Sequence, residues 1–313
     1  MATSQLPDNC PAAISPDDPA APAHAQRMRQ HLGDFITRAA NGSLRLVSPP
    51  AQPSLTTRGA GHLHLNAELF LQVQGHTEFH FPQGQVRLQA GEALVMPPKL
   101  LHDEWVAGGK GQAFSNMVIH ADHQSMSCHL ANEARPGRPA CLYLEVYPHV
   151  DAARIEAWLN DAAKPPAQDT HGLWAVQQRA LVLTALSAVS RLLDAPEKTT
   201  SSEPTLLVRL RVLVQNRLGE VELTVASLAE ELGCTADYLS HLYSRSTGEH
   251  LWQVILRQRL ARAARLLAEN DSAVKEIAWC SGFASASYFI RSFKLQFGVT
   301  PKVFRSQARA TVH

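Results

Sequence analysis

Four side chains that can bind a cation lie in two short stretches of the first half of the chain. His62, His64 and Glu68 belong to "GHLHLNAELFLQVQG", and His102 ends "GEALVMPPKLLH". Residues 62, 64 and 68 are separated by even numbers, so they share one face of an extended strand. Three imidazoles and one carboxylate can hold a first-row divalent metal ion. The same side chains could instead hydrogen-bond a small ligand or one another, and the sequence leaves both interpretations open.

A second stretch combines aromatic and basic side chains. Residues 282–305, "GFASASYFIRSFKLQFGVTPKVFR", contain five Phe and four Lys or Arg but no Asp or Glu. Phe at helical spacing indicates a packed core, whereas basic residues without acidic neighbours indicate an anionic partner. From residue 206 onward the chain has 14 Lys and Arg against 9 Asp and Glu, a net charge of +5, while residues 1–205 carry −4. This asymmetry suggests nucleic acid as a partner, the alternative being a chance excess of solvated charge.

The same pattern occurs twice in this basic region. "LAEELGCTADYLSHLYSRSTG" (228–248) and "IAWCSGFASASYFIRSFKLQFG" (277–298) each begin with an apolar residue and Ala, have Gly four residues after that Ala, and end at Gly. The small Ala lets two helices approach closely, and the Gly permits the sharp turn of a helix-turn-helix unit. The two Ala are 49 residues apart, which leaves room for a long helix over residues 251–270. The repeat therefore predicts a double helix-turn-helix domain.

Capping residues mark where the helices of this domain are expected to begin. Ser or Thr stands at four N-cap positions, namely Thr224, Thr235, Ser272 and Ser285, and Thr300-Pro301 places Pro at a first helical position. The aromatic face of the second unit is expected to be core, formed by Phe283, Phe289, Phe293 and Phe297.

The C-terminal region resembles the AraC/XylS family of bacterial transcription regulators. The resemblance covers residues 206–308 and is carried by "YLSHLYSRSTGEHLWQVILRQRLARAARLL" and "VKEIAWCSGFASASYFIRSFKLQFGVTPKVFR". The ending G-x-T-P-x-x-[FY]-R of the second stretch is highly specific. The resemblance implies two helix-turn-helix units joined by one long helix, each presenting a recognition helix to a major groove on one face of the DNA.

The family pattern also implies which side chains contact DNA. The positions expected to face bases are Asp237, Ser240 and His241 in the first unit and Ala286, Ser287, Ile290 and Arg291 in the second. The positions expected to face phosphates are Ser244, Arg245 and Lys294. Asp237 departs from the pattern, because a carboxylate can face a cytosine amino group but repels phosphates, and a role at the helix N-terminus is the alternative. Arg259 resembles an Arg of the family's long helix, for which a structural role is expected.

The two N-terminal stretches resemble the cupin motifs H-x-H-x(3,4)-E-x(6)-G and G-x(5)-P-x-G-x(2)-H. Lys99 stands where the second motif has glycine. AraC-type regulators commonly carry a cupin-like barrel as an effector-binding and dimerisation domain. The resemblance therefore implies that His62, His64, Glu68 and His102 converge in a barrel, as effector ligands or as ligands of a divalent metal.

The remaining patterning indicates a two-domain α+β protein. Short apolar runs and frequent turn signals predict strands over residues 43–120. Residues 151–194 change to helical periodicity, with an apolar face at 172–194 that is too wide for one neighbour and predicts a subunit contact through Leu186 and Leu193. The expected divisions are a disordered tail (1–30), a cupin-like effector-binding barrel (31–150), dimerisation helices (151–194), a linker (195–205) and the helical DNA-binding domain (206–310).

Composition limits the class of protein further. The chain has 313 residues and a net charge of +1, and it has no run of about 18 apolar residues, so no membrane span is expected. The N-terminus lacks the pattern of a secretory signal. The five Cys form no C-x-x-C pair, which is typical of a reducing cytosol, and a cytoplasmic location is expected.

These features predict a one-component transcription regulator and not an enzyme. Its expected partners are promoter DNA, a small-molecule effector, a second copy in a homodimer, and RNA polymerase if it activates transcription. No cofactor is expected apart from the divalent metal considered above. Two rival interpretations are a cupin-type metal-dependent enzyme or metal sensor using the four-residue site, and a helical protein-interaction module.

Overall fold

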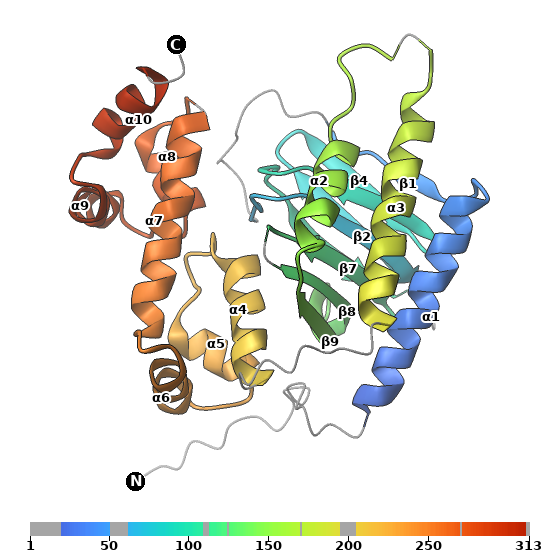
Figure 1. Cartoon of the computed structure of the whole chain (residues 1–313), viewed down its shortest axis with the longest axis horizontal. Coiled ribbons are helices and arrows are strands. Elements are labelled where there is room, and N and C mark those ends of the chain that lie inside the picture. The colour runs from blue at the N-terminus through green and yellow to red at the C-terminus, as the bar shows by residue number, and fades with distance from the viewer. Residues whose placement is uncertain are drawn as a thin grey trace.

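The computed structural model describes residues 20–50, 62–108, 113–123, 125–169, 171–194, 205–269 and 271–310. A β-rich part with three helices precedes an all-helical part, and the two lie side by side (Figure 1). Residues 195–204 of the predicted linker (195–205) and residues 1–19 of the predicted tail lie outside the described residues, and Thr205 already belongs to a helix.

The strands of the first part form two sheets. The six-stranded sheet has the order β1 (Arg45–Val47), β5 (Glu92–Met96), β2 (Glu68–Gln74), β7 (Ser115–Ala121), β8 (Ser125–Arg135) and β9 (Arg138–Pro148). The three-stranded sheet has the order β4 (Gly84–Gln89), β3 (His76–Phe81) and β6 (Asp103–Ala107). They approach each other at one edge, where the Val106 N–H donates to the Gly137 carbonyl over 3.1 Å. Among the described residues this pairing gives two sheets, so the predicted closed barrel is not confirmed.

Apolar side chains from both sheets share a core. Phe70 on β2 and Phe79 on β3 meet edge to face at 4.9 Å between ring centroids, and Leu94 and Val118 pack in the same cluster. Alternation along the strands sends these residues to the inner face. The two sheets therefore face each other, and this inner space also contains the predicted four-residue site.

Three helices cover the outer face of the large sheet: α1 (Ala21–Ala40), α2 (Ala152–Ala162) and α3 (Trp174–Asp194) (Figure 1). Helix α1 corrects the sequence prediction, because residues 21–30 are helical and do not belong to a tail. Its buried face contains Met28, Leu32, Phe35 and Ala39, a spacing of four, three and four residues. That face packs into the same core as α3, and this burial stabilises a helix that an Ala- and Pro-rich start concealed.

The wide apolar face of α3 is buried within the chain. Helix α3 contacts both α1 and α2, and Leu186 and Leu193 are buried in the core that these helices share with the sheet. Two partners within one chain account for the width of the face. The wide apolar face of α3 therefore gives no indication of a contact with a second copy of the chain, and the homodimer stays a prediction.

In the second part, the described residues 205–269 and 271–310 form seven helices. They are α4 (Thr205–Arg217), α5 (Val225–Glu231), α6 (Ala236–Thr247), α7 (Leu251–Glu269), α8 (Val274–Cys280), α9 (Ala286–Phe297) and α10 (Pro301–Ala310). Thr224, Thr235 and Ser285 cap α5, α6 and α9 as predicted, each accepting a backbone N–H three residues on. The prediction for Ser272 was wrong: Ala273 precedes α8, and its N–H donates to the Glu276 carboxylate over 2.9 Å.

Each helix-turn-helix unit has its own core. The first unit, α5 and α6, packs on α4 through Leu-rich contacts that include Leu228 and Leu239. The second unit, α8 and α9, packs on α7 through Phe283, Phe289 and Phe293, which are buried as predicted. Leu63, from the β-rich first part, belongs to this second core.

Candidate nucleic-acid interface and histidine-lined pocket

The two expected recognition helices have the same length and the same kinds of residue at their ends. Helices α6 and α9 each span 12 residues, begin after a Thr or Ser cap, and end at a left-handed glycine, Gly248 (φ 75°) or Gly298 (φ 76°). A shift of 50 residues therefore superposes their positions, so that His241 matches Arg291 and Ser244 matches Lys294. Figure 1 shows both helices nearly end-on, with α6 at the lower end of α7 and α9 beside the middle of α7.

The structure places every predicted DNA-contacting residue on one of these two helices. The exposed ones are Asp237, His241, Arg245, Ser287, Ile290, Arg291 and Lys294, and the partly buried ones are Ser240, Ser244 and Ala286. The apolar side chains Leu239, Phe289 and Phe293 turn inward, as helical periodicity requires. The outer faces, which are polar apart from exposed residues such as Ile290 and Leu295, are thus available to a ligand outside the domain.

Arg259 has the structural role expected of it. Its guanidinium donates to the backbone carbonyls of Leu218, Glu220 and Leu223 over 2.7–3.2 Å. These carbonyls lie in the turn after α4, so Arg259 ties α7 to the first unit.

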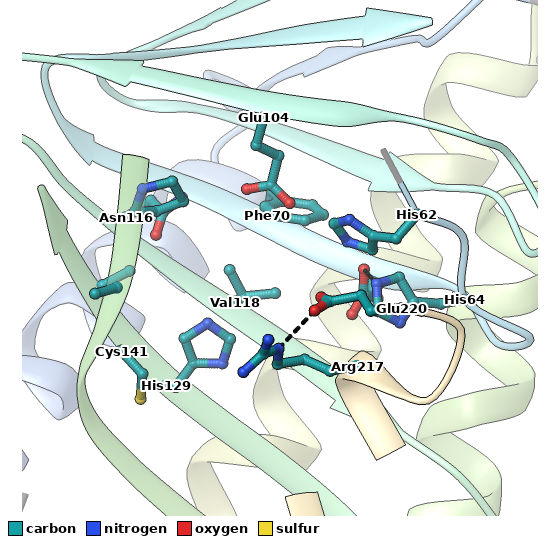
Figure 2. Close-up of a pocket in the computed structure, with 14 residues that line it drawn as sticks. His62, His64, Phe70, Glu104, Asn116, Val118, His129, Cys141, Arg217 and Glu220 are labelled. Carbon is teal, nitrogen blue, oxygen red and sulfur yellow. Dashed lines mark hydrogen bonds and ion pairs between the residues drawn. The ribbon is translucent and has the colours of Figure 1, made fainter. Parts of the chain in front are cut away.

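A cavity of about 170 Å³ lies between the two sheets and the start of the helical part. Its walls include His62, His64, Glu104 and His129 from the sensor part, and Arg217 and Glu220 from the helical part (Figure 2). Arg217 Nε donates to Glu220 Oε2 over 2.8 Å at this boundary. The helical part therefore completes the pocket of the sensor part.

Three of the four predicted site residues converge. One ring nitrogen from each of His62, His64 and His102 lies within 4.8 Å of the other two. A two-residue β-bridge sets part of this arrangement, because the backbones of His62 and His102 exchange two hydrogen bonds of 2.9 Å. Glu68 lies beside the group, with Oε2 3.4 Å from His64 Nε2, but outside it.

Several polar atoms of this cluster have no hydrogen-bond partner. They are His102 Nε2, Glu68 Oε2 and His120 Nδ1, all buried. The Nδ1 atom of His102 lies 2.9 Å from the Leu100 carbonyl oxygen, so Nδ1 carries the proton and Nε2 keeps its lone pair. Buried polar atoms without partners are costly, at about 1–3 kcal/mol each, which indicates a site built for an occupant.

Burial keeps this cluster neutral. It lowers the pKa of His62 and His64 well below their usual range, the neighbouring imidazoles adding to the effect, and it lowers the pKa of His102 to about 4. It raises the pKa of Glu68 well above its usual range, with a further contribution from Glu104, whose own pKa burial raises to about 7. Neutral imidazoles with free lone pairs are the form that binds metal ions.

Sequence reasoning missed part of the pocket. Glu104 and His129, from β6 and β8, line the pocket and belong to no motif. His120 on β7, also outside any motif, lies beside the pocket near Glu68. Arg217 and Glu220 come from the other domain, and no local pattern predicts how two domains dock.

The sensor and helical parts are joined by specific contacts. Arg262 on α7 donates through Nη2 to the Leu63 carbonyl over 2.7 Å, and Gln215 on α4 donates to Asp122 over 2.7 Å. Lys99, at the position of the cupin glycine, has a left-handed backbone (φ 66°) and forms an ion pair with Glu269 of α7. Among the described helices, none combines the length and the apolar character that crossing a membrane requires.

The chain combines a β-rich domain that contains a pocket with two helix-turn-helix units of matching length and capping. This combination is typical of ligand-responsive transcription regulators. Residues 55–203 match the AraC-like ligand binding domain, and residues 228–307 match the helix-turn-helix domain family. The chain belongs to the AraC family of transcriptional regulators, which is not a family of enzymes.

Similar proteins are regulators as well. The chain is 30% identical over 129 residues to the uncharacterized HTH-type transcriptional regulator YijO of Escherichia coli (strain K12), covering 41% of this chain and 45% of that protein. It is 48% identical over 52 residues to the HTH-type transcriptional activator CsvR of Escherichia coli, covering 17% of this chain and 20% of that protein. The chain thus matches less than half of the length of these relatives.

Solved structures give weaker likenesses. The DNA-binding domain of AdpA, a global transcriptional factor in complex with a target DNA, has a TM-score of 0.33 and 27% identity, covering 34% of this chain and 96% of that one. ToxT from Vibrio cholerae has a TM-score of 0.28 and 12% identity, covering 78% of this chain and 91% of that one. The family membership rests on the sequence matches.

Proposed function

We propose that this protein is a cytoplasmic, one-component transcription regulator that binds promoter DNA through α6 and α9 and responds to a small effector in the sensor pocket. The observation that carries the proposal is the pair of helices of equal length, with matching caps and exposed outer faces, that pack at different places along α7. Arg291 and Lys294 on α9 supply the positive charge that DNA recognition needs.

The length of α7 supports contacts with successive major grooves. Its 19 residues span about 28 Å at about 1.5 Å per residue. Major grooves on one face of B-DNA recur about every 34 Å, so the two helices can enter adjacent grooves with a modest bend of the duplex. We include a homodimer, and RNA polymerase as a partner if the protein activates transcription, as parts of this proposal.

A binding experiment tests the proposal against its rivals. The full chain is titrated onto a labelled duplex from the region upstream of its own gene and onto a random duplex, with fluorescence anisotropy as the readout. Specific binding should be about 10³-fold tighter or more than random binding at equal salt. A protein-interaction module gives no such difference, and that result would overturn the proposal.

A further inference from the structure

We propose that His62, His64 and His102 bind a divalent transition-metal ion, and that the bound ion fixes the segment His62–Leu65 against α7 and thereby the turn of the second helix-turn-helix unit. This inference deepens the proposed function, on which its regulatory meaning rests, by naming the chemical class of the effector. It is carried by the donor geometry of the cluster and by the two-sided contacts of the segment.

The donor set suits such an ion. Zinc–imidazole bonds are about 2.0–2.1 Å long, so three nitrogens within 4.8 Å of one another can close on one ion with small side-chain movements. The hydrogen bond from His102 Nδ1 to the Leu100 carbonyl fixes the ring and directs the unpartnered Nε2 toward the site, as the outer hydrogen bonds of metal-binding histidines do. Imidazole donors favour Zn, Cu, Ni and Fe over Mg or Ca.

Two carboxyl groups near the three histidines complement a cation. Glu68, with an unpartnered Oε2, lies 3.4 Å from His64, and Glu104 Oε1 lies 3.8 Å from His102 Nε2. Both carboxyl groups are buried, and a nearby cation would let them ionise. The cavity of about 170 Å³ is below the range of about 300–1,000 Å³ typical of organic-ligand pockets, so an ion with one or two small ligands fits it better than a larger effector.

The segment that supplies two of the ligands also contacts the helical part. His62 and His64 line the cavity, whereas Leu63 and Leu65 pack in the core of the second unit. The Leu63 carbonyl accepts from Arg262, and the Leu65 carbonyl accepts from Arg265 over 3.3 Å. Movement of the histidines toward an ion therefore moves the leucines and carbonyls that hold α7.

Arg262 extends this connection to the second unit. The buried guanidinium donates to the Leu63 carbonyl and, through Nε, to the Cys280 carbonyl over 3.0 Å. Cys280 ends α8 and is followed by the turn at Gly282 that leads to α9. A single side chain thus bonds the metal-binding segment on one side and the helix-turn-helix turn on the other.

Metal binding is tested on the full chain after treatment with a chelator and its removal. Titration with Zn²⁺ by calorimetry and with Co²⁺ by visible absorption should give one ion per chain. His102→Asn and His64→Gln should each weaken binding at least 100-fold, whereas His129→Gln, at a partly buried histidine of the same cavity, should change it less than threefold. Absence of a 1:1 complex in the unaltered chain overturns the inference, as does equal weakening by His129→Gln.

The coupling is tested by hydrogen exchange with and without Zn²⁺. The ion should slow exchange at residues 281–283 about fivefold or more, within the usual range of coupling between sites. Arg262→Met should abolish that response while the chain still binds one ion, and Arg265→Met, on the same helix, should leave most of it. No slowing in the zinc-bound unaltered chain, or an unchanged response in Arg262→Met, would exclude this route. Both readouts need no DNA, so a failure of specific DNA binding would count against the proposed function and not against the metal site.

Discussion

In the first helix-turn-helix unit, α6 presents Asp237 and His241, where α9 of the second presents Ser287 and Arg291. The helices share the type of N-cap, the length and the terminal glycine. They therefore differ in the side chains that they expose and not in how they begin and end. Because phosphates repel a carboxylate and attract a guanidinium, the second unit should supply more of the affinity for DNA.

The two units also differ in what lies behind them. The second unit shares its core with Leu63 and is bonded to the sensor segment through Arg262. The first unit reaches the pocket through charged groups, since Arg217 bonds both Glu220 in the pocket wall and Glu231 of α5. The two copies of the motif thus differ in their contacts with the sensor domain as well as in their outer faces, and the four changes below compare the two units.

The largest effect is expected from the core of the second unit. Phe289→Ala removes a fully buried ring that meets Phe283 and Phe293, and it should lower the free energy of unfolding by about 3–5 kcal/mol. Leu239→Ala, at the matching position of the first unit, should cost about 2–5 kcal/mol. Urea titration of the full chain followed by circular dichroism measures both. A loss below about 1 kcal/mol for Phe289→Ala would contradict the shared core.

Arg291→Ala should be the most damaging change on the outer faces. If Arg291 contacts a base, the change costs about 1–3 kcal/mol on the specific site and much less on random DNA. His241→Ala, at the matching position, should cost less because a neutral imidazole makes no bidentate contact with guanine. Anisotropy titrations on both duplexes measure this. Equal losses on both duplexes would reassign Arg291 to a phosphate.

Lys294→Ala should weaken binding to specific and random DNA alike. It removes one expected phosphate contact, so the slope of log K against log salt should become shallower by about one. Ser244→Ala, its match on α6, removes no charge and should leave the slope unchanged. Titrations at four salt concentrations decide the matter, and identical slopes for Lys294→Ala and the unaltered chain would exclude the contact.

Asp237→Asn should have the smallest effect, with opposite signs on stability and binding. The carboxylate lies in the first turn of α6, where it complements the helix dipole, so its loss should cost about 0.3–1 kcal/mol of stability. Removal of a negative charge from the outer face should at the same time tighten DNA binding about twofold. Tighter binding without loss of stability would mean that Asp237 has no capping role.

The helix boundaries of the C-terminal part could be predicted closely because local residues determine them. Thr235, Ser285 and the terminal glycines mark boundaries that depend on neighbouring residues alone. The predictions failed where contacts between segments distant in the sequence determine the structure. Helix α1 depends on burial against α3, and Arg217 and Glu220 join the pocket only when the two domains dock.

The histidine site was partly predictable for the same reason. His62 and His64 meet as expected, and the structure adds His102 to them. The prediction that residues 62, 64 and 68 share one strand was wrong, because the chain bends at residues 65–66 and β2 begins only at Glu68. Glu68 was expected among the ligands but lies beside the group, near His120, which no motif singles out. The side-chain position of a carboxylate between two imidazoles is decided by the whole cluster and not by sequence spacing.

The alternation of residues 62–65 also fixes the length of this segment. Each neighbour belongs to a different environment, with histidines in the polar cavity and leucines in the core of the second unit. One inserted or deleted residue would displace the two sets from these environments, because neighbouring side chains of this segment lie on different sides of the chain. Insertions should therefore be tolerated here only in pairs, and a one-residue insertion would bury imidazoles among Phe and Leu side chains while exposing Leu63 to the carboxyl groups of the pocket.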